Sequence, residues 1–337
     1  MNDFIKNLLP APLNGGFAMP GYWVWCGSVI KGDDGRYHMF ASRWPQTMKF
    51  APGWLFHSEV VRASSDSYLG PFRFEEVVLP VRDKMFFDGR TTHNPVIRKY
   101  GGKYLLYYMG CSYHFTPDET DQNEGERYLE AWYNKRIGLA VSDSVLGPWK
   151  RPDVPLFEPR KDNWDFYGNT NPAPCIMDDG RVYMFYKAMT KDRHLNIGLA
   201  TAENFAGPYM RSDYQLHFSS LSGAADIEDP FLWHQDGVFH ILAKDLTGKI
   251  CGEKYAGIHA FSKDCIKWEL PDQPKAYSRK VRWDNDSVTE QGALERPQLL
   301  MENGVPVCMY AATSRGDTGY WNAKESWNMA IPIGKSK

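Results

Sequence analysis

Apolar residues along this chain fall into five pairs of short runs, and a tight, glycine-containing polar turn joins the two runs of each pair. The five segments are WCGSVIKGDDGRYHMFASRW, HNPVIRKYGGKYLLYYMG, TNPAPCIMDDGRVYMFYKAM, EDPFLWHQDGVFHILAKD and ERPQLLMENGVPVCMYAATS. Asp-Gly, Gly-Gly and Asn-Gly supply the positive φ that a two-residue turn between antiparallel strands requires. Each segment therefore predicts a β-hairpin, with turn glycines at Gly35, Gly102, Gly180, Gly237 and Gly304.

A second motif follows the hairpins at a constant place. The first three units each end in Gly-Pro followed by an aromatic residue, in the segments SSDSYLGPF, VSDSVLGPW and TAENFAGPY. A degenerate version in the fourth unit, AFSKDCIKW, ends at Trp268. Each unit is therefore expected to hold four antiparallel strands, and a series of such units is the sequence form of a β-propeller. Five unrelated hairpins in a sandwich would give no reason for the second motif to recur in phase.

We expect one all-β domain over residues 1–337, a five-bladed β-propeller with four-stranded antiparallel blades around a central funnel. The blades are expected at residues 20–75, 90–151, 167–212, 225–270 and 290–335. Two stretches interrupt the repeat. The acidic segment from Cys111 to Arg136 is predicted to be a surface excursion, with room for one short helix, over one mouth of the propeller. Tyr277 to Ala293 links the fourth and fifth units.

Composition narrows the class of protein. A formal net charge of -2 disfavours a nucleic-acid partner. No stretch reaches the roughly 18 apolar residues of a membrane helix, and no export signal is visible, so we expect a cytoplasmic protein without a membrane partner. The aromatic content of 15% is typical of proteins that stack rings on sugars or pack many short strands. Six scattered cysteines without a Cys-x-x-Cys pair are expected to be free, mostly buried thiols.

Aligning the units on their turns lets the start of the inner strand be compared five times. The residue before the repeated proline is Asn94, Asn171, Asp229 or Arg296, and the first unit has Cys26 before Gly27. One position earlier stand Trp25, His93, Thr170, Glu228 and Glu295. Because the inner strands of a propeller converge on its axis, these unlike polar groups predict a ligand site in the funnel. Asn94 and Asn171 also fit the simpler role of starting a strand.

The Asx-Pro strand starts, the Gly-Pro-aromatic blade ends and the axial acids resemble the five-bladed β-propeller glycoside hydrolases of family 43 and its relatives, families 32, 62, 117 and 130. The resemblance covers residues 20 to 335 and implies a glycosidase with a carbohydrate substrate. Family 43 uses three axial carboxylates, one of them in an Asp-Pro at the start of the first blade. This sequence has Cys26 there and carries its Asp-Pro at Asp229 in the fourth unit, so the three roles do not transfer blade by blade.

Glycoside hydrolysis needs one carboxylic acid to protonate the leaving oxygen and one carboxylate to activate water or attack the anomeric carbon. Adjacent strand residues point to opposite faces, so only one of Glu228 and Asp229 is expected to face the centre of the funnel while the other braces the neighbouring blade; we favour Asp229 at the centre, with Glu228 as the alternative. We expect Asp229 as general base and Glu295 as general acid, with the reverse assignment also open. Asp88 is expected to orient them if the approach FFDGRTTHNP dips into the funnel; a surface turn is the alternative there and at Asp165.

The other axial polar groups are expected to bind substrate. They are Arg90, His93, Asn94, Asn171, Glu228 and Arg296, with Trp25 or Trp44 as a stacking wall and blade packing as the alternative for Trp44. No metal is expected among the site residues, because no His, Cys and Asp spacing demands one, and no cofactor is expected to be required. The resemblance to family 43 allows a structural cation such as calcium in the central channel.

Two alternatives keep the same fold. A glycoside phosphorylase, as in family 130, would replace water by phosphate and would need basic groups near the funnel, such as Arg90, Lys187, Lys244, Arg296 and Arg315. A catalytically silent sugar-binding propeller would account for the absent first-blade aspartate, and it predicts glycan binding without bond cleavage. Nucleotide chemistry has no support, because no Gly-rich phosphate loop is present.

Overall fold

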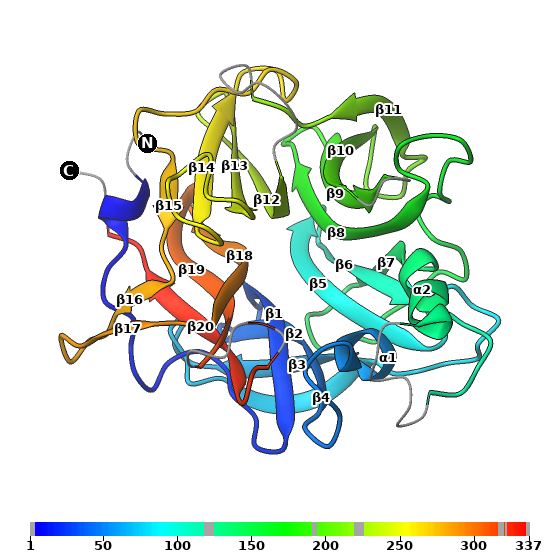
Figure 1. The fold of residues 1–337 in the computed structure, drawn as a ribbon, viewed down its shortest axis with the longest axis horizontal. Coiled ribbons are helices and arrows are strands. Elements are labelled where there is room, and N and C mark those ends of the chain that lie inside the picture. The colour runs from blue at the N-terminus through cyan, green and yellow to red at the C-terminus, as the bar shows by residue number, and fades with distance from the viewer. Residues whose placement is uncertain are drawn as a thin grey trace.

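Five antiparallel sheets surround a common axis in the computed structural model, which describes residues 4–117, 125–190, 194–218, 226–315, 320 and 322–334 (Figure 1). The predicted five-bladed β-propeller is therefore confirmed. The strand nearest the axis in each blade is β1 (Tyr22–Lys31), β5 (Thr91–Tyr100), β8 (Tyr167–Ile176), β12 (Ile227–Gln235) or β18 (Ala293–Glu302).

Each inner strand is joined by a tight turn to its antiparallel neighbour. These second strands are β2 (Tyr37–Pro45), β6 (Lys103–Cys111), β9 (Val182–Met189), β13 (Val238–Asp245) and β19 (Val305–Ser314). The five turn glycines have φ between +75° and +90°, a conformation that residues with a Cβ adopt at a cost. The five hairpins predicted from the sequence are all present.

The outer part of the blades is less regular. The third strands are β3 (Glu59–Ser65), β7 (Arg136–Ser142), β10 (Leu195–Ala202), β14 (Gly257–Ser262) and β20 (Ser326–Pro332). Fourth strands are β4 (Arg73–Leu79), β11 (Met210–Gln215) and β15 (Lys275–Tyr277). In the second blade, the edge is reduced to an antiparallel bridge between Val141 and Lys150.

The fifth blade is completed by an N-terminal segment that includes Leu9 and Phe17. This segment follows the short helix η1 (Phe4–Asn7). Phe17 and Asn328 exchange both backbone hydrogen bonds, at 2.8 and 2.9 Å, and the Leu9 amide donates to the Pro332 carbonyl at 2.9 Å. The two ends of the polypeptide accordingly lie together in Figure 1. No strand was expected before residue 20, so this closure of the propeller was not predicted.

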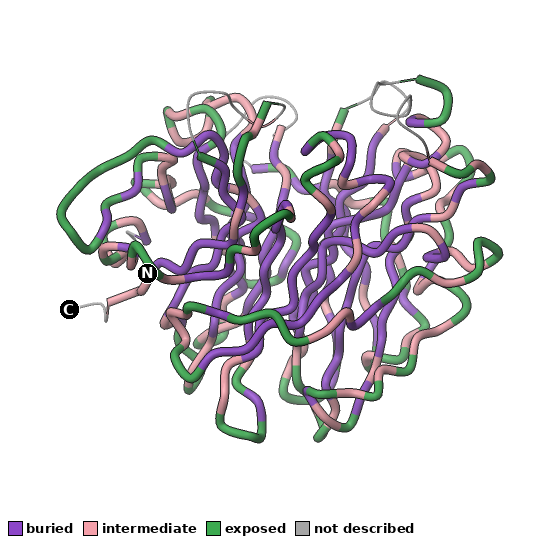
Figure 2. The backbone as a smooth tube through the Cα atoms, turned by 90° about the horizontal axis from the view of Figure 1, so that it is seen from below, coloured by how far each residue is buried: buried purple, intermediate pink, exposed green. Residues whose placement is uncertain are grey.

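Hydrophobic clusters fill the spaces between neighbouring blades, and the backbone in the interior of the molecule is largely buried whereas the exposed segments are mostly loops at its ends and sides (Figure 2). One example is the contact of Phe185 in the third blade with Trp268 in the fourth, whose ring centroids are 5.6 Å apart. All six cysteines are free and five are buried, as predicted. No helix within the described residues is long and apolar enough to cross a membrane.

Three short elements lie outside the blades and approach one end of the axis or the rim. Helix α1 (Gly53–His57) separates β2 from β3, and α2 (Glu126–Tyr133) lies within the excursion predicted between Cys111 and Arg136. Helices α1 and α2 contact each other, and α2 also contacts β8. The small hairpin of β16 (Lys280–Arg282) and β17 (Val288–Glu290) forms most of the link between the fourth and fifth blades.

Candidate active site

Every inner strand bends at the same place. The residues that align before the repeated proline, Cys26, Asn94, Asn171, Asp229 and Arg296, have φ values of 56°, 52°, 52°, 58° and 54°. The register of each inner hairpin shifts at that residue. Asn and Asp tolerate this left-handed conformation better than Cys or Arg do. The sequence repeat therefore marks a repeated β-bulge, which aims five side chains at the axis.

These five residues form a hydrogen-bonded belt around the axis. The Cys26 thiol donates to Asn94 Oδ1 at 2.7 Å, and Asn94 Nδ2 donates to Asn171 Oδ1 at 2.5 Å. Asn171 Nδ2 donates to Asp229 Oδ1 at 2.7 Å, and the Arg296 backbone amide donates to Asp229 Oδ2 at 3.2 Å. Burial raises the pKa of the Cys26 thiol, so it is a hydrogen-bond donor and not a nucleophile.

A cavity of about 530 Å³ opens above this belt. Part of its wall is supplied by the belt and the residues that precede it, and the rest comes from the helices and the last loops. Aromatic side chains on its lining are Trp25, Trp54, Tyr128, Trp132, Tyr255 and Tyr320. A larger hollow of about 840 Å³ lies among the hairpin turns at the other end of the strands, and the cluster of carboxylates described next does not belong to it.

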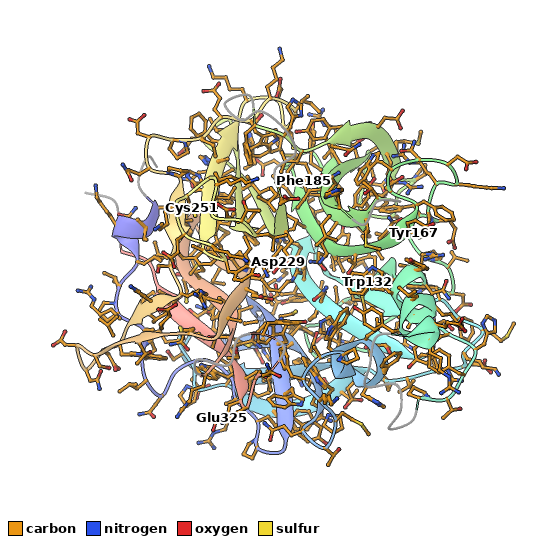
Figure 3. All side chains as sticks on the ribbon, in the orientation of Figure 1. Trp132, Tyr167, Phe185, Asp229, Cys251 and Glu325 are labelled. Atoms are coloured by element: carbon orange, nitrogen blue, oxygen red, sulfur yellow. The ribbon has the colours of Figure 1, made fainter. Side chains whose placement is uncertain are left out.

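Three carboxylates converge in the cavity around one lysine. Single oxygens of Glu228, Asp229 and Glu295 lie within 4.8 Å of one another. The ammonium nitrogen of Lys244 is 2.5 Å from Glu228 Oε1, 2.7 Å from Glu295 Oε1 and 3.9 Å from Asp229 Oδ2. Lys187 adds a second contact to Glu228, at 2.8 Å from Oε2. Figure 3 shows Asp229 near the centre of the propeller.

The two glutamates differ in protonation. Burial raises the pKa of Glu295 to about 7, and the charges of Asp229 and Glu228 add to this effect while Lys244 opposes it. Burial would also raise the pKa of Glu228, but Lys187 and Lys244 together outweigh it and hold that pKa well below its ordinary value. One carboxyl can therefore carry a proton near neutral pH beside another that stays ionised, which is the division that acid and base catalysis requires.

The same carboxylates are the only group of three or more metal-ligating side chains found among the described residues. The Lys244 ammonium already lies between their oxygens, and Glu228, Glu295 and Asp229 raise its pKa well above the ordinary value although burial opposes them. A permanently charged lysine thus supplies the cation that these oxygens need. The donor set does not fit an additional metal ion.

The expected division between Glu228 and Asp229 differs from what the structure shows. Both side chains line the cavity, with 15% of the Glu228 side chain and 4% of the Asp229 side chain exposed. Strand alternation would have placed them on opposite faces, but the left-handed φ of Asp229 interrupts it. Glu228 is therefore a cavity carboxylate and not a brace between blades.

Asp88 does not lie in the cavity, so its expected place beside the axial acids is wrong. It is fully buried between the second blade and its approach segment, where Arg82 Nε donates to it at 2.6 Å and the Tyr108 hydroxyl at 2.7 Å. Arg151 approaches to 3.6 Å. The Cβ that Gly110 lacks would clash with the Asp88 side chain, so the two are closely packed.

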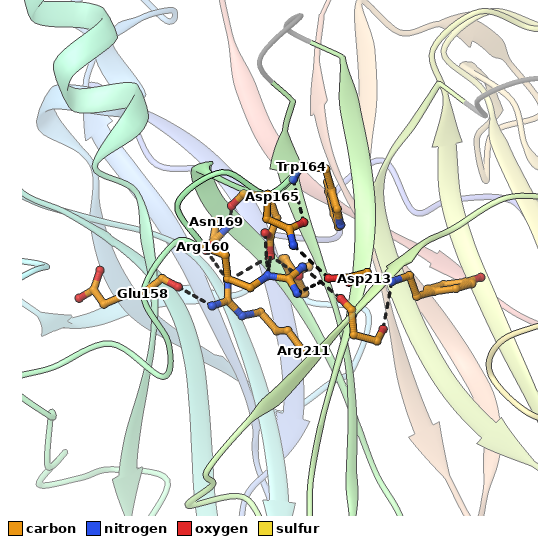
Figure 4. Close-up of polar contacts among 11 residues, drawn as sticks. Glu158, Arg160, Trp164, Asp165, Asn169, Arg211 and Asp213 are labelled. Atoms are coloured by element: carbon orange, nitrogen blue, oxygen red, sulfur yellow. Dashed lines mark hydrogen bonds and ion pairs between the residues drawn. The ribbon is translucent and has the colours of Figure 1, made fainter.

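Asp165 has the same environment one blade further along (Figure 4). Arg160 Nε donates to it at 2.9 Å, the Tyr186 hydroxyl at 2.7 Å and Arg211 Nη1 at 3.0 Å. Each aspartate stands six positions before the belt residue of its blade. The pair is a repeated internal support of the blades and has no part in the cavity.

The other expected site residues separate into two groups. The cavity lining includes five of them: Trp25, His93, Asn94, Asn171 and Arg296. Arg90 and Trp44 are not on its lining; the Arg90 side chain donates to the Tyr113 carbonyl at 3.4 Å, and Trp44 is buried against Phe50. Arg315 pairs with Glu325 on the surface, so of the proposed basic groups only Lys187, Lys244 and Arg296 reach the cavity.

Several cavity residues were missed because they come from outside the repeat. Trp54 comes from α1, Tyr128 and Trp132 from α2, and Lys135 from the residues just after α2. The only signal in the sequence was that the excursion from Cys111 to Arg136 would cover one mouth of the propeller. Its aromatic run YLEAWY could have been recognised as a wall for a polar ring site.

The fold and this site define a five-bladed propeller with an acidic axial cavity, and solved structures of the same fold are known. "Zg3597, a family 117 glycoside hydrolase, produced by the marine bacterium Zobellia galactanivorans" has a TM-score of 0.65 and 16% identity over 96% of this protein and 89% of that one. A second solved structure, a "Glycoside hydrolase", has a TM-score of 0.66 and 16% identity over 98% and 92%. "Native Bacillus subtilis Arabinanase Arb43A" has a TM-score of 0.61 and 15% identity over 92% and 93%.

At this level of identity the likeness establishes the fold, and it confirms the architecture that the resemblance to families 43 and 117 implied. The sequence matches no protein-family model and no curated protein. Activity must therefore be argued from the cavity itself.

Proposed function

We propose that this protein is a glycoside hydrolase in which Glu295 is the general acid and Glu228 is the ionised carboxylate. The observation that carries the proposal is the convergence of two buried carboxyls on one lysine in the same cavity, where Glu228 has a second lysine as a partner and Glu295 does not. Glycosidic cleavage needs this combination at one bond. The three solved propellers described above are two glycoside hydrolases and an arabinanase, which supports the same class of reaction.

In this mechanism Glu295 donates its proton to the glycosidic oxygen as the bond to the anomeric carbon breaks. Glu228, kept ionised by Lys187 and Lys244, faces the positive charge that develops on the sugar. Single oxygens of the two residues lie within 4.8 Å of each other, below the ~6.5–9.5 Å carboxyl separation that leaves room for a water. We therefore propose a retaining reaction in which Glu228 attacks the anomeric carbon as the leaving group departs with the proton of Glu295. The Glu295 carboxylate then takes a proton from water, whose oxygen attacks the anomeric carbon, breaks the bond to Glu228 and releases the sugar.

Asp229, the general base expected from the sequence, receives a different role. It is the least exposed of the three carboxylates and accepts hydrogen bonds from Asn171 and the Arg296 amide, so its oxygens are engaged in the belt. Its charge helps to keep Glu295 protonated. We propose that Asp229 is a positioning residue that acts through Glu295.

The aromatic walls of the cavity suit a sugar ring. Trp54 and Trp132 meet edge to face with centroids 5.8 Å apart, and Trp25 and Tyr320 meet in the same way at 6.0 Å. Sugar rings present apolar C–H faces that pack on aromatic faces, while their hydroxyls need polar partners. The belt amides of Asn94 and Asn171 lie on the cavity floor, although each is already engaged in the belt.

The test is hydrolysis of a panel of aryl furanosides and pyranosides by the wild type and by Glu295→Gln. Loss of a general acid should lower kcat by about 10²–10⁴-fold. Glu203→Gln, which changes an exposed glutamate of the third blade, should leave kcat unchanged. If the wild type binds glycans but cleaves none, the protein is a sugar-binding propeller. If cleavage requires phosphate, it is a phosphorylase.

A further inference from the structure

Charge is distributed unequally across the cavity. The acids come from the fourth and fifth blades and pair with Lys187 of the third blade and Lys244 of the fourth. On the side of the second and third blades, Lys135 lines the cavity with 1% of its surface exposed. Among the described residues, no carboxylate oxygen is paired with its ammonium within 4.0 Å. The cavity therefore has an acidic half and a half lined by the unpaired amine of Lys135.

The position of Lys135 is built by its neighbours. Its ammonium lies 3.0 Å from the centroid of the Trp132 ring and 5.5 Å from that of Trp54. Gly168 in β8 has φ +59, and a Cβ there would come within 3.0 Å of Lys135 Cε and 2.7 Å of the Trp132 carbonyl. A glycine on the inner strand of the third blade thus makes room for the lysine that follows α2. Burying an amine without an acid is unfavourable, so a ligand is the natural reason to keep it.

Arg296 gives an independent indication on the cavity floor. It is 2% exposed, and its guanidinium nitrogens lack an oxygen acceptor in the described part of the protein, although they lie beside the Cys26 thiol. Its nearest acid is Asp229, whose Oδ1 is 3.6 Å from Nη1. His93 lies close to both regions, because burial, then Arg296, Lys135 and Lys187, lower its pKa well below the ordinary value. Lys135, Lys187 and Arg296 therefore all act on one histidine that lines the same cavity.

We propose that the side of the cavity lined by the unpaired amine of Lys135, with Lys187 and Arg296 also on the lining, binds an anionic oxygen group, and that this group is the carboxylate of a uronic acid in the glycan substrate. The inference rests on the proposed function, which places the scissile bond at Glu228 and Glu295. Inorganic phosphate offers the same chemistry from a second source. Charged hydrogen bonds of this kind are about twice as strong as neutral ones, so they would select acidic over neutral sugars.

The first test compares sugars that differ only at C6. Binding of D-galacturonate, D-glucuronate, D-galactose and D-glucose to the wild type would be measured by calorimetry at low salt. We expect at least one uronate to bind about tenfold more tightly than its neutral partner, and we expect Lys135→Met to abolish that preference. Lys263→Met, at an exposed position of the fourth blade, should preserve it. Equal binding of both uronates and their neutral partners would overturn the inference.

Phosphate forms a separate arm of the same titration. If phosphate binds to the wild type but not to Lys135→Met, and no uronate is preferred, the anionic group is phosphate and the uronic-acid assignment is wrong. If a uronate is preferred and phosphate only competes with it, the uronic-acid assignment stands.

A second readout excludes a merely structural role for Lys135. Methionine keeps the length of the stem on Trp132 and removes an amine that has no acidic partner. The thermal midpoint of Lys135→Met should therefore be equal to or higher than that of the wild type, while the uronate preference is lost. A marked fall in the midpoint together with unchanged sugar preference would show that Lys135 only supports the fold.

Proton uptake gives a third measurement. Burial lowers the pKa of Lys135 well below its ordinary value and Lys187 on β9 lowers it further, while Cys111 on β6 and Glu228 on β12 oppose this shift. His93 on β5 faces the same region and is neutral. A carboxylate bound beside Lys135 favours the ammonium form, so binding should take up a proton. Titrations in two buffers of different ionisation enthalpy should reveal this uptake, and Lys135→Met should lack it.

The inference and the proposed function can fail separately. Glu295→Gln should lose hydrolysis and keep the preference for a uronate, since Glu295 lies in the acidic half. Hydrolysis of neutral glycosides in preference to their uronic-acid counterparts would overturn the inference and leave the hydrolase assignment intact. Uronate binding without any Glu295-dependent cleavage would support the inference and overturn the hydrolase assignment.

Discussion

Buried carboxylates occur in two settings in this propeller, and both are surrounded by cations. Asp88 and Asp165 stand between their blades and the approach segments, each held by a tyrosine hydroxyl and two arginines. Glu228 and Glu295 stand in the axial cavity, where they share the single ammonium of Lys244. Burial and an adjacent cation therefore do not distinguish a supporting acid from a reactive one.

The difference lies in how completely each oxygen is satisfied. Both oxygens of Asp88 have a close donor of their own, and the residue is closed off from the cavity. In the cavity, Glu228 is paired with both Lys187 and Lys244, whereas Glu295 has only a share of Lys244, so the pKa values of the two carboxyls diverge. Competition for one cation marks the reactive group, and complete pairing marks the supporting group.

Replacing Glu228 should give the largest effect on activity. Glu228→Gln keeps the volume of the side chain but removes the ionised carboxylate, and kcat should fall by about 10²–10⁴-fold because the developing positive charge on the sugar loses its partner. The free energy of unfolding should also fall, by about 3 kcal/mol, because Lys187 and Lys244 lose a buried counter-charge, so kcat is measured on the folded fraction. Unchanged kcat would move the ionised role to Asp229, as the sequence alone suggested.

The stereochemical course offers a further check on the same residue. If Glu228 is the nucleophile, the first product released from an aryl glycoside should keep the anomeric configuration of the substrate. Proton NMR of the fresh product decides this within minutes of mixing. Inversion would require a water between the carboxyls and would contradict the retaining assignment.

Replacing Asp88 should lower the stability of the protein and leave kcat unchanged. Asp88→Asn leaves Arg82 and Arg151 without a full counter-charge beside a buried site, and the free energy of unfolding should fall by about 3 kcal/mol. The kcat of the folded fraction should be unchanged, because Asp88 lies outside the cavity. Urea denaturation of Asp88→Asn beside Asp153→Asn gives the comparison.

Asp153 is a matched control for this prediction. It pairs with the same Arg82, at 3.0 Å, but 72% of its side chain is exposed. Exposed pairs contribute little to stability because water and salt screen them. Equal destabilisation by the two substitutions would show that the burial of Asp88 does not matter.

The repeat in the sequence was enough to predict the propeller, because hairpin turns and Gly-Pro-aromatic ends are local signals. The closure of the fifth blade by Phe17 was not predictable in this way, since the pairing with Asn328 joins opposite ends of the sequence and the N-terminal segment carries no copy of the repeat. Local patterns reveal hairpins, but they do not reveal which distant segment covers an open edge.

Only part of the site was predicted, because only the residues inside the repeat could be compared between units. The belt positions and Glu295 followed from aligning the units, whereas the orientation of Glu228 depended on strand alternation that the bulge interrupts. Asn94, Asn171 and Asp229 are residues that favour positive φ, so the bulge could have been inferred from them. Lys135 and Trp132 could not be aligned with anything, because an excursion outside the repeat supplies them.

The smallest expected effect is a shift in pH dependence, and it separates Asp229 from its neighbours. A general acid must be protonated, so activity of the wild type should fall as pH rises through about 7, the pKa of Glu295. The charge of Asp229 is one of the causes that raise this pKa. Asp229→Asn removes the charge, so the pKa of Glu295 should fall and activity should be lost at a lower pH, by about one unit.

Asn also tolerates the left-handed φ of position 229 and can keep the belt hydrogen bonds, so the fold of Asp229→Asn should be preserved. The profile of kcat/KM against pH measures the shift, with Asp226→Asn as the control three positions away. If Asp229→Asn instead lowers kcat/KM at every pH and leaves the pH of the alkaline decline unchanged, Asp229 is the catalytic base. That result would overturn its role as a positioning residue.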